Sequence, residues 1–218
     1  MKKIWEKIKG MKDLSHIAIA NIVGKALAAI FWFFLAALLG AEAYGQVSYL
    51  IAAATVVGGL SIVGGTQTIT VYTAKKISIQ PPIYLIAVIL GTIGSVITYF
   101  ILDNIVISFF AMGYIIFNLI IANLLGKKLY TKYAIYFIIQ KIIFVASATI
   151  LYFLIGVNGI VLGYAISFLA FTGSMINEFR NTKLEFTVLK PRVKFMAHSY
   201  GLTIERLVSG QTDKLIIE

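Results

Sequence analysis

The chain contains no cysteine, and acidic residues are scarce. Its 218 residues include 9 Asp and Glu against 19 Lys and Arg, and charged residues make up only 13%. The lack of cysteine excludes disulfides, thiolate metal sites and a cysteine nucleophile, and it carries no information about the compartment. No GxxxxGK[ST] phosphate loop occurs, so the chain has no nucleotide-hydrolysing motor of that type.

Histidine is equally rare, and no metal-binding or catalytic constellation is visible. His16 and His198 are far apart, and neither has a carboxylate or histidine partner at ligand spacing. The few acidic residues include no close pair suited to glycosyl or peptide hydrolysis. We therefore expect no enzymatic activity, no metal and no cofactor.

Apolar residues are present in large excess. They make up 60% of the chain, and the mean hydropathy is +0.92. A hydrocarbon core of about 30 Å needs roughly 20 helical residues to cross it. Six stretches of the sequence meet that length: 17–39, 46–74, 82–102, 105–125, 133–155 and 160–176. The fold class predicted is an all-α, polytopic transmembrane helix bundle.

The links between these stretches alternate in charge. Basic residues cluster before the first stretch and after the second, fourth and sixth, whereas the links 40–45, 103–104 and 156–159 contain none. The positive-inside rule therefore predicts a multi-pass protein of the cytoplasmic membrane with its N-terminus and the loop 177–194 inside. The net charge of +10 lies in these membrane-flanking loops, so the anionic partner expected is lipid headgroups and not nucleic acid.

The chain divides into four parts on this interpretation. They are a cytoplasmic basic N-terminal segment (1–16), a six-helix transmembrane lobe (17–176), a cytoplasmic loop (177–194) and a terminal segment (195–218). The terminal segment is apolar but contains charged residues such as Glu205, Arg206 and Asp213. We expect 195–210 to lie along the inner interface or to pack on the bundle. A truncated seventh helix would then begin near Asp213 and continue past the end of the chain.

Glycine is concentrated at two places within the apolar stretches. The second stretch contains four glycines, Gly58, Gly59, Gly64 and Gly65. They are compatible with a broken or bent helix or with ordinary close packing, and the sequence favours close packing. A GxxxG pair in the sixth stretch, Gly159 and Gly163, predicts helix packing within the bundle more strongly than dimerisation.

Four polar residues inside the apolar stretches are the candidate site. Lys25 and Lys141 each lie eight residues beyond the start of an inside-to-outside span, which is about 12 Å deep at about 1.5 Å per residue. Gln67 reaches a similar depth, and Asn21 lies one turn from Lys25. Such a cationic layer would suit an anionic substrate group. Snorkelling is the alternative for both lysines, and interhelical hydrogen bonding is the favoured role for Gln67 and Asn21.

The N-terminal quarter also contains a family motif. Leu38-Leu39-Gly40 is followed by Ala41-Glu42-Ala43-Tyr44-Gly45, then by a small-residue-rich stretch. This resembles the "LG-x-E-x-YG" turn of polysaccharide flippases in the multidrug/oligosaccharidyl-lipid/polysaccharide exporter superfamily. The stretch Gly210-Gln-Thr-Asp213-Lys214 looks like the opening of that family's seventh helix.

The resemblance implies a transporter of two six-helix lobes, of which this chain would be the N-terminal one plus the start of a seventh helix. It implies that a polyprenyl-linked oligosaccharide or polysaccharide precursor is flipped by alternating access. The partners would be that lipid-linked anionic glycan, membrane lipids, and a missing C-terminal lobe or a second copy. Lys25 is the residue that the resemblance suggests for contact with the substrate. A multidrug or toxin exporter of the same superfamily and a non-transporting scaffold subunit of a glycan-assembly complex are the alternatives.

Overall fold

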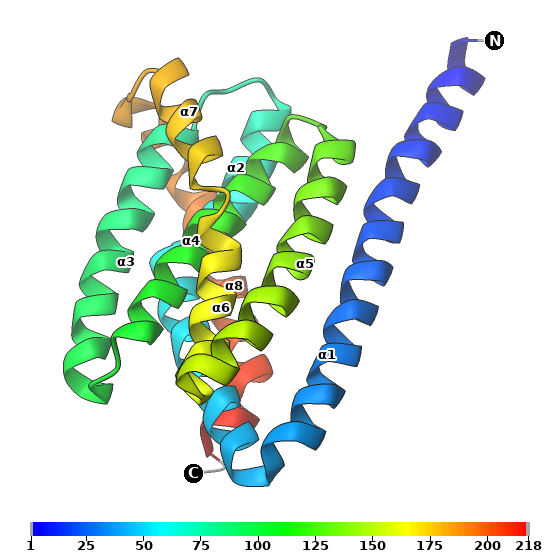
Figure 1. Cartoon of the computed structure of the whole chain (residues 1–218). Helices are drawn as coiled ribbons and strands as arrows, with labels where there is room; N and C mark the ends of the chain where they lie inside the picture. Colours follow the sequence, from blue (N-terminus) through cyan, green and yellow to red (C-terminus); the bar gives the residue numbers. More distant parts are fainter. Residues whose placement is uncertain (1, 217–218) are drawn as a thin grey trace.

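The structure is a computed structural model that describes the backbone of residues 2–216 and the side chains of 15 and 17–210. Every regular element in the described residues is helical, as Figure 1 shows. The α-helices are α1 (Lys2–Ser61), α2 (Gly65–Ala74), α3 (Gln80–Leu102), α4 (Ile105–Gly126), α5 (Tyr130–Ile155), α6 (Val157–Leu169), α7 (Thr172–Asn181) and α8 (Val193–Ile216). Two 3-10 turns, Phe186–Val188 and Lys190–Arg192, precede α8. The all-α prediction is therefore confirmed.

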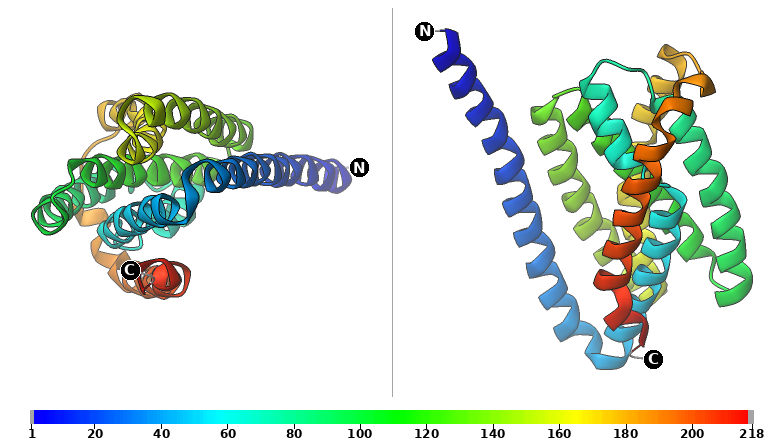
Figure 2. Two further views of the ribbon diagram at one scale, coloured as in Figure 1. Left: turned by 60° about the horizontal axis from the view of Figure 1, so that its bottom comes forward. Right: turned by 180° about the vertical axis from the view of Figure 1, so that it is seen from behind.

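Five helices among the described residues are long and apolar enough to cross a membrane, whereas the sequence predicted six apolar spans. The difference lies in the first of them, Ile17–Ser61, which contains 45 residues. This helix bends at Gly40, where φ is 73° and ψ is 174°, so the chain reverses direction there (Figures 1 and 2). A positive φ is readily accessible only to glycine. We call residues 2–39 the first limb of α1 and residues 41–61 the second limb.

The predicted span 46–74 contains a break, which is the alternative that the sequence did not favour. The second limb ends at Ser61, and α2 begins at Gly65, with Val63 and Gly64 at positive φ between them. Close packing and a break occur together here. A Cβ on Gly64 would lie 2.5 Å from the carbonyl oxygen of Met196 in α8, so this glycine allows α8 to approach the break.

The sixth predicted span, 160–176, also has different bounds. The helix α6 ends at Leu169, and α7 continues the path from Thr172 to Asn181. The loop expected at 177–194 therefore starts with the last turn of α7. An ion pair between Lys127 and Glu178, with Nζ to Oε2 at 2.7 Å, links that turn to the end of α4.

The terminal segment forms one helix, α8, which packs on α1 and α2 (Figure 2). The contact is close, because a Cβ on Gly59 would lie 2.7 Å from Leu207. The helix continues through Asp213 without a break in the backbone. The side chain of Asp213 lies outside the described residues.

The links without basic residues meet at one end of the bundle, next to the bend in α1 (Figure 1). Asp103 ends α3 in the left-handed region with φ of 46°, and the Asn104 side chain accepts a hydrogen bond from the backbone N–H of Val106, which caps α4. Asn104 then donates from Nδ2 to Oδ1 of Asn158 at 2.9 Å. The links 103–104 and 156–159 thus form two tight helical hairpins, which this hydrogen bond joins.

Basic links occupy the opposite end. Helices α2 and α4 both end with a lysine in the left-handed region, Lys76 with φ of 61° and Lys128 with φ of 58°. The backbone N–H of the next residue reaches back in each case, from Ile77 to Tyr72 and from Leu129 to Leu124. This is the Schellman pattern, which normally places glycine at the left-handed position. The alternation of charge along the sequence therefore corresponds to two ends of the bundle.

The glycine pair in α6 packs within the bundle, as predicted. A Cβ on Gly163 would lie 2.5 Å from Cα of Ala148 in α5, and the Ser147 hydroxyl donates to the Gly163 carbonyl oxygen at 2.9 Å. Beside this contact the rings of Phe144 and Tyr164 stack with centroids 3.9 Å apart. These contacts make α5 and α6 one rigid pair.

Candidate functional site

Lys25 lies on the first limb of α1 with an exposed side chain. Gly24 marks the face of this limb that packs on α5, because a Cβ there would lie 2.5 Å from the Phe137 ring. Lys25, the next residue, is rotated from that face by about 100° around the helix axis. It precedes Trp32 by seven residues, so the two share a helix face. The Trp32 ring contacts Tyr44 beyond the bend, with centroids 6.0 Å apart, and Phe144 of α5, with centroids 6.2 Å apart.

The opposite face of the first limb is apolar and exposed. Val23, Ile30 and Phe34 lie on it, and Ile30 is 68% exposed. Such a face suits lipid tails. Lys25 is turned away from these three side chains, although Ile22, three residues before it, is also 67% exposed. Its ammonium group forms no ion pair in the part of the chain that the structure describes.

Lys141 differs from Lys25 because it is packed between aromatic rings. Its Nζ donates to the hydroxyl of Tyr164 at 3.3 Å and lies 5.5 Å from the centroid of Phe137 and 5.4 Å from that of Tyr164. Its Cγ would be 3.6 Å from a Cβ on Gly24, so Lys141 borders the α1–α5 seam next to Lys25. A cation over ring faces is held by their quadrupoles.

Asn21 makes the interhelical hydrogen bond expected of it. Its Oδ1 accepts from the hydroxyl of Tyr133 in α5 at 3.3 Å. Asn21, Lys25 and Lys141 thus lie along one seam between the first limb of α1 and α5.

Gln67 does not lie on this seam. It lines a cavity of about 400 Å³ between α2 and α4, which Phe195 of α8 also borders. Thr70 bridges the two helices at that cavity by donating to the Ala122 carbonyl oxygen at 3.2 Å. The sequence grouped Gln67 with the two lysines by depth, but the structure divides these residues between two places.

The outer face of α8 is charged, which is unusual for a helix on an apolar bundle. His198, Glu205 and Arg206 are exposed, whereas Ser199 and Leu207 face the bundle. A face with such charges does not suit lipid tails, because each charge at the bilayer centre costs about 2.5–3.5 kcal/mol on insertion scales.

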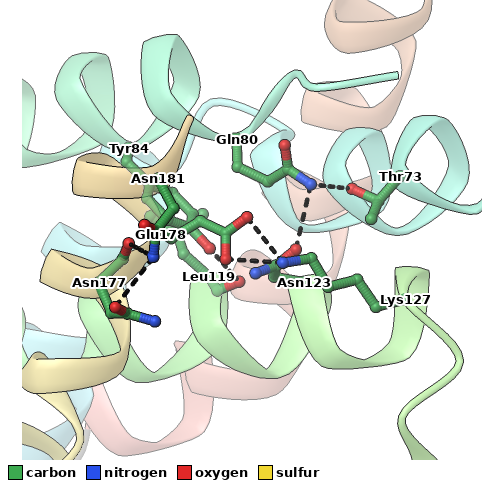
Figure 3. Close-up of polar contacts among 9 residues, drawn as sticks. All are labelled: Thr73, Gln80, Tyr84, Leu119, Asn123, Lys127, Asn177, Glu178 and Asn181. Carbon is green, nitrogen blue, oxygen red and sulfur yellow. Dashed lines mark hydrogen bonds and ion pairs between the residues drawn. The ribbon is translucent and has the colours of Figure 1, made fainter. Parts of the chain in front are cut away.

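Sequence reasoning did not identify a buried polar cluster at the basic end, which Figure 3 shows. Gln80, at the first turn of α3, donates from Nε2 to Oγ1 of Thr73 at 2.8 Å and to Oδ1 of Asn123 at 3.1 Å. The same end contains the pair between Lys127 and Glu178. The only signal in the sequence is an amide directly before Pro81-Pro82, which by itself indicates no more than the start of a helix.

Comparison with protein-family models, curated proteins and solved structures found no match for this chain.

Proposed function

We propose that this chain is one lobe of a membrane transporter that flips a lipid-linked anionic oligosaccharide or polysaccharide precursor across the cytoplasmic membrane. The basic end, with the N-terminus, is cytoplasmic in this proposal, which agrees with the positive-inside rule. The observation that supports it most is the exposed side chain of Lys25, which lies within an apolar helix and is turned away from Val23, Ile30 and Phe34.

The path of the chain is compatible with a six-helix lobe. The two limbs of α1 run in opposite senses around Gly40. The second limb with α2 gives one crossing, and α6 with α7 gives another. Added to the first limb and to α3, α4 and α5, these make six crossings. A helix break in mid-membrane is acceptable where protein covers the backbone, and α8 covers this one at Gly64.

The charge of Lys25 suits an anionic substrate group. A cationic side chain at about 12 Å depth is tolerated when it meets water or an anion. Asn21 on the same face is already bonded to Tyr133, so it positions α1 against α5, while Lys25 stays available for ligand. Lys141, held by Tyr164 and Phe137, supplies a second positive charge beside the same seam.

The charged face of α8 indicates where the rest of a transporter would lie. His198, Glu205 and Arg206 require water or protein as neighbours. In two-lobe transporters the substrate site lies between the lobes, and the lobes rock about it. A second lobe or a second copy facing α8 across a hydrated cavity would meet this requirement.

The charge of the residues within the spans also favours a glycan flippase over a drug exporter of the same superfamily. Exporters of cationic drugs use acidic residues within the membrane, and the six predicted spans contain no Asp or Glu. The basic seam at Lys25 and Lys141 would repel a cationic drug.

The test is export of the glycan in host cells carrying variants of the full-length gene product. Lys25→Ala should abolish export while the amount of protein in the membrane stays normal. Lys25→Arg should retain part of the activity, because the charge remains while the planar fork replaces a compact ammonium. Lys132→Ala removes an exposed lysine at the start of α5 and serves as the matched control. Normal export with Lys25→Ala would refute the role of Lys25.

A second measurement separates a transporter from a scaffold. The wild-type gene product, reconstituted in vesicles, should move a fluorescent polyprenyl-diphosphate oligosaccharide between leaflets. If it moves none, but glycosyltransferases copurify with it, the scaffold function replaces the proposed one.

A further inference from the structure

A second cavity, at the basic end, lies apart from the Lys25 seam. It has a volume of about 480 Å³ and is enclosed by the ends of α2, α4 and α7 and the start of α3. Its lining includes Lys76, Ser78, Gln80, Lys127, Lys128 and Glu178. This volume is within the range of small-molecule sites, which is about 300–1,000 Å³.

The charge inside this cavity is unbalanced. Glu178 is the one carboxylate among the described residues that line it, and both oxygens of Glu178 lie 2.7 Å from Nζ of Lys127. Lys76 and Lys128 have no ion-pair partner among the residues that the structure describes. Two positive charges therefore remain for an occupant, which favours an anion.

Gln80 contributes a buried acceptor that no group of the protein uses. Its side chain is 3% exposed, and its Nε2 is fully engaged by Thr73 and Asn123. Its Oε1 has no hydrogen-bond partner within the described chain. Figure 3 shows this carbonyl oxygen directed away from both partners. Buried acceptors in proteins are normally paired, so this oxygen at the cavity lining is left for a donor that the described chain does not supply.

We propose that this cavity binds a phosphate ester that carries a hydroxyl group. Lys76 and Lys128 bind the phosphate, and Gln80 Oε1 accepts a hydrogen bond from the hydroxyl. The group can come from a phospholipid such as phosphatidylglycerol, whose headgroup lies at the membrane surface, or from a soluble sugar or glycerol phosphate. The proposal is independent of glycan transport.

The test uses the full chain in mild detergent, with bound ligand counted by native mass spectrometry. Phosphatidylglycerol should be retained more than phosphatidylcholine, which has no net charge. It should also be retained more than phosphatidic acid, which has a phosphate and no headgroup hydroxyl. The soluble probe is glycerol 3-phosphate. Binding of phosphatidylglycerol alone identifies a lipid site, and equal binding of the soluble probe identifies a soluble ligand; both outcomes support the phosphate-ester site.

Two variants test the residues. Lys76→Gln/Lys128→Gln should weaken retention of phosphatidylglycerol about thirtyfold at low salt, from the usual contribution of a lysine at an anionic surface. Lys132→Gln/Lys183→Gln removes two exposed lysines that do not line the cavity and should change retention less than about twofold. Gln80→Leu should abolish the preference for phosphatidylglycerol over phosphatidic acid.

Three results would overturn the proposal. They are unchanged retention in the double variant of Lys76 and Lys128, equal retention of phosphatidylcholine and phosphatidylglycerol by the wild-type chain, and a wild-type preference for phosphatidic acid. The second and third need no substitution, so they hold even if Gln80→Leu fails to fold. Glycan export is not measured in any arm, so failure here is distinguishable from failure of the transport proposal.

Discussion

Gly163 lies where α6 crosses α5, and replacing it with alanine tests how the bundle is held together. The added Cβ would lie 2.5 Å from Cα of Ala148 and 2.7 Å from the carbonyl carbon of Ser147. Carbon atoms normally pack at about 3.5–4.0 Å, so the two helices must separate locally by about 1 Å. Because the obstructing atoms belong to backbone, no side-chain rotation can relieve the overlap.

The magnitude follows from two opposing effects. Overpacking typically costs about 1–3 kcal/mol, and a backbone obstruction places Gly163→Ala at the upper end. Replacing a helical glycine with alanine stabilises the helix by up to about 1 kcal/mol through helix propensity. The hydrogen bond from the Ser147 hydroxyl to the Gly163 carbonyl oxygen, now 2.9 Å, would also lengthen. We expect a net loss of about 2 kcal/mol in the free energy of unfolding.

The assay is thermal unfolding of the purified chain in detergent, followed by the loss of the monodisperse peak in size-exclusion chromatography. Gly173→Ala in α7 is the matched control, because a Cβ there meets nothing within 4 Å. Alanine at position 173 should leave the midpoint unchanged or raise it slightly, through its helix propensity. If Gly163→Ala is as stable as Gly173→Ala, the close α5–α6 contact does not hold the bundle together.

Three shorter predictions concern the ends of the bundle and the helix break. Asp103→Cys should react with an impermeant thiol reagent added outside the cell, and Lys128→Cys should react only with reagent added inside. The reverse pattern would refute the proposed orientation. Gly64→Ala should lower the unfolding midpoint, because its φ of 67° and the backbone of α8 both disfavour a Cβ; an unchanged midpoint would contradict the break at this residue. Lys127→Met should lower the free energy of unfolding by less than about 1 kcal/mol, because its ion pair with Glu178 is solvent-accessible. A larger loss in the same assay would contradict this and would show that the pair holds α7.

The local features of this fold could be predicted from the sequence. Asp103-Asn104 forms a turn because Asp103 ends α3 in the left-handed region and Asn104 caps the start of α4. Both interactions involve only residues close in the sequence. The alternation of basic links required only counting, and the structure places Lys76 and Lys128 at one end and Asn104 and Asn158 at the other. Local chemistry of this kind acts in the same way in any tertiary environment.

The break between the second limb and α2 could not be decided in the same way. Its four glycines are compatible with a kink and with close packing, and the helix that contacts Gly64 comes from residues 193–216. A contact between segments so far apart in the chain leaves no local pattern. The same limit applies to Gln80, whose two hydrogen-bond partners come from α2 and α4.

The grouping of the candidate site failed for a geometrical reason that applies to any helix bundle. Counting residues from a membrane interface gives one coordinate, the depth, and the sequence assigned a similar depth to Lys25, Lys141 and Gln67. A common site also requires a common angular position, which depends on which helices adjoin. Here the first limb of α1 packs on α5, and Lys141 lies against Gly24, the residue before Lys25. In contrast, α2 packs on α4 and takes Gln67 to a separate cavity. The position of Gly24 therefore relates Lys25 to Lys141 better than their predicted depth does, because Gly24 marks the face on which the first limb packs against α5.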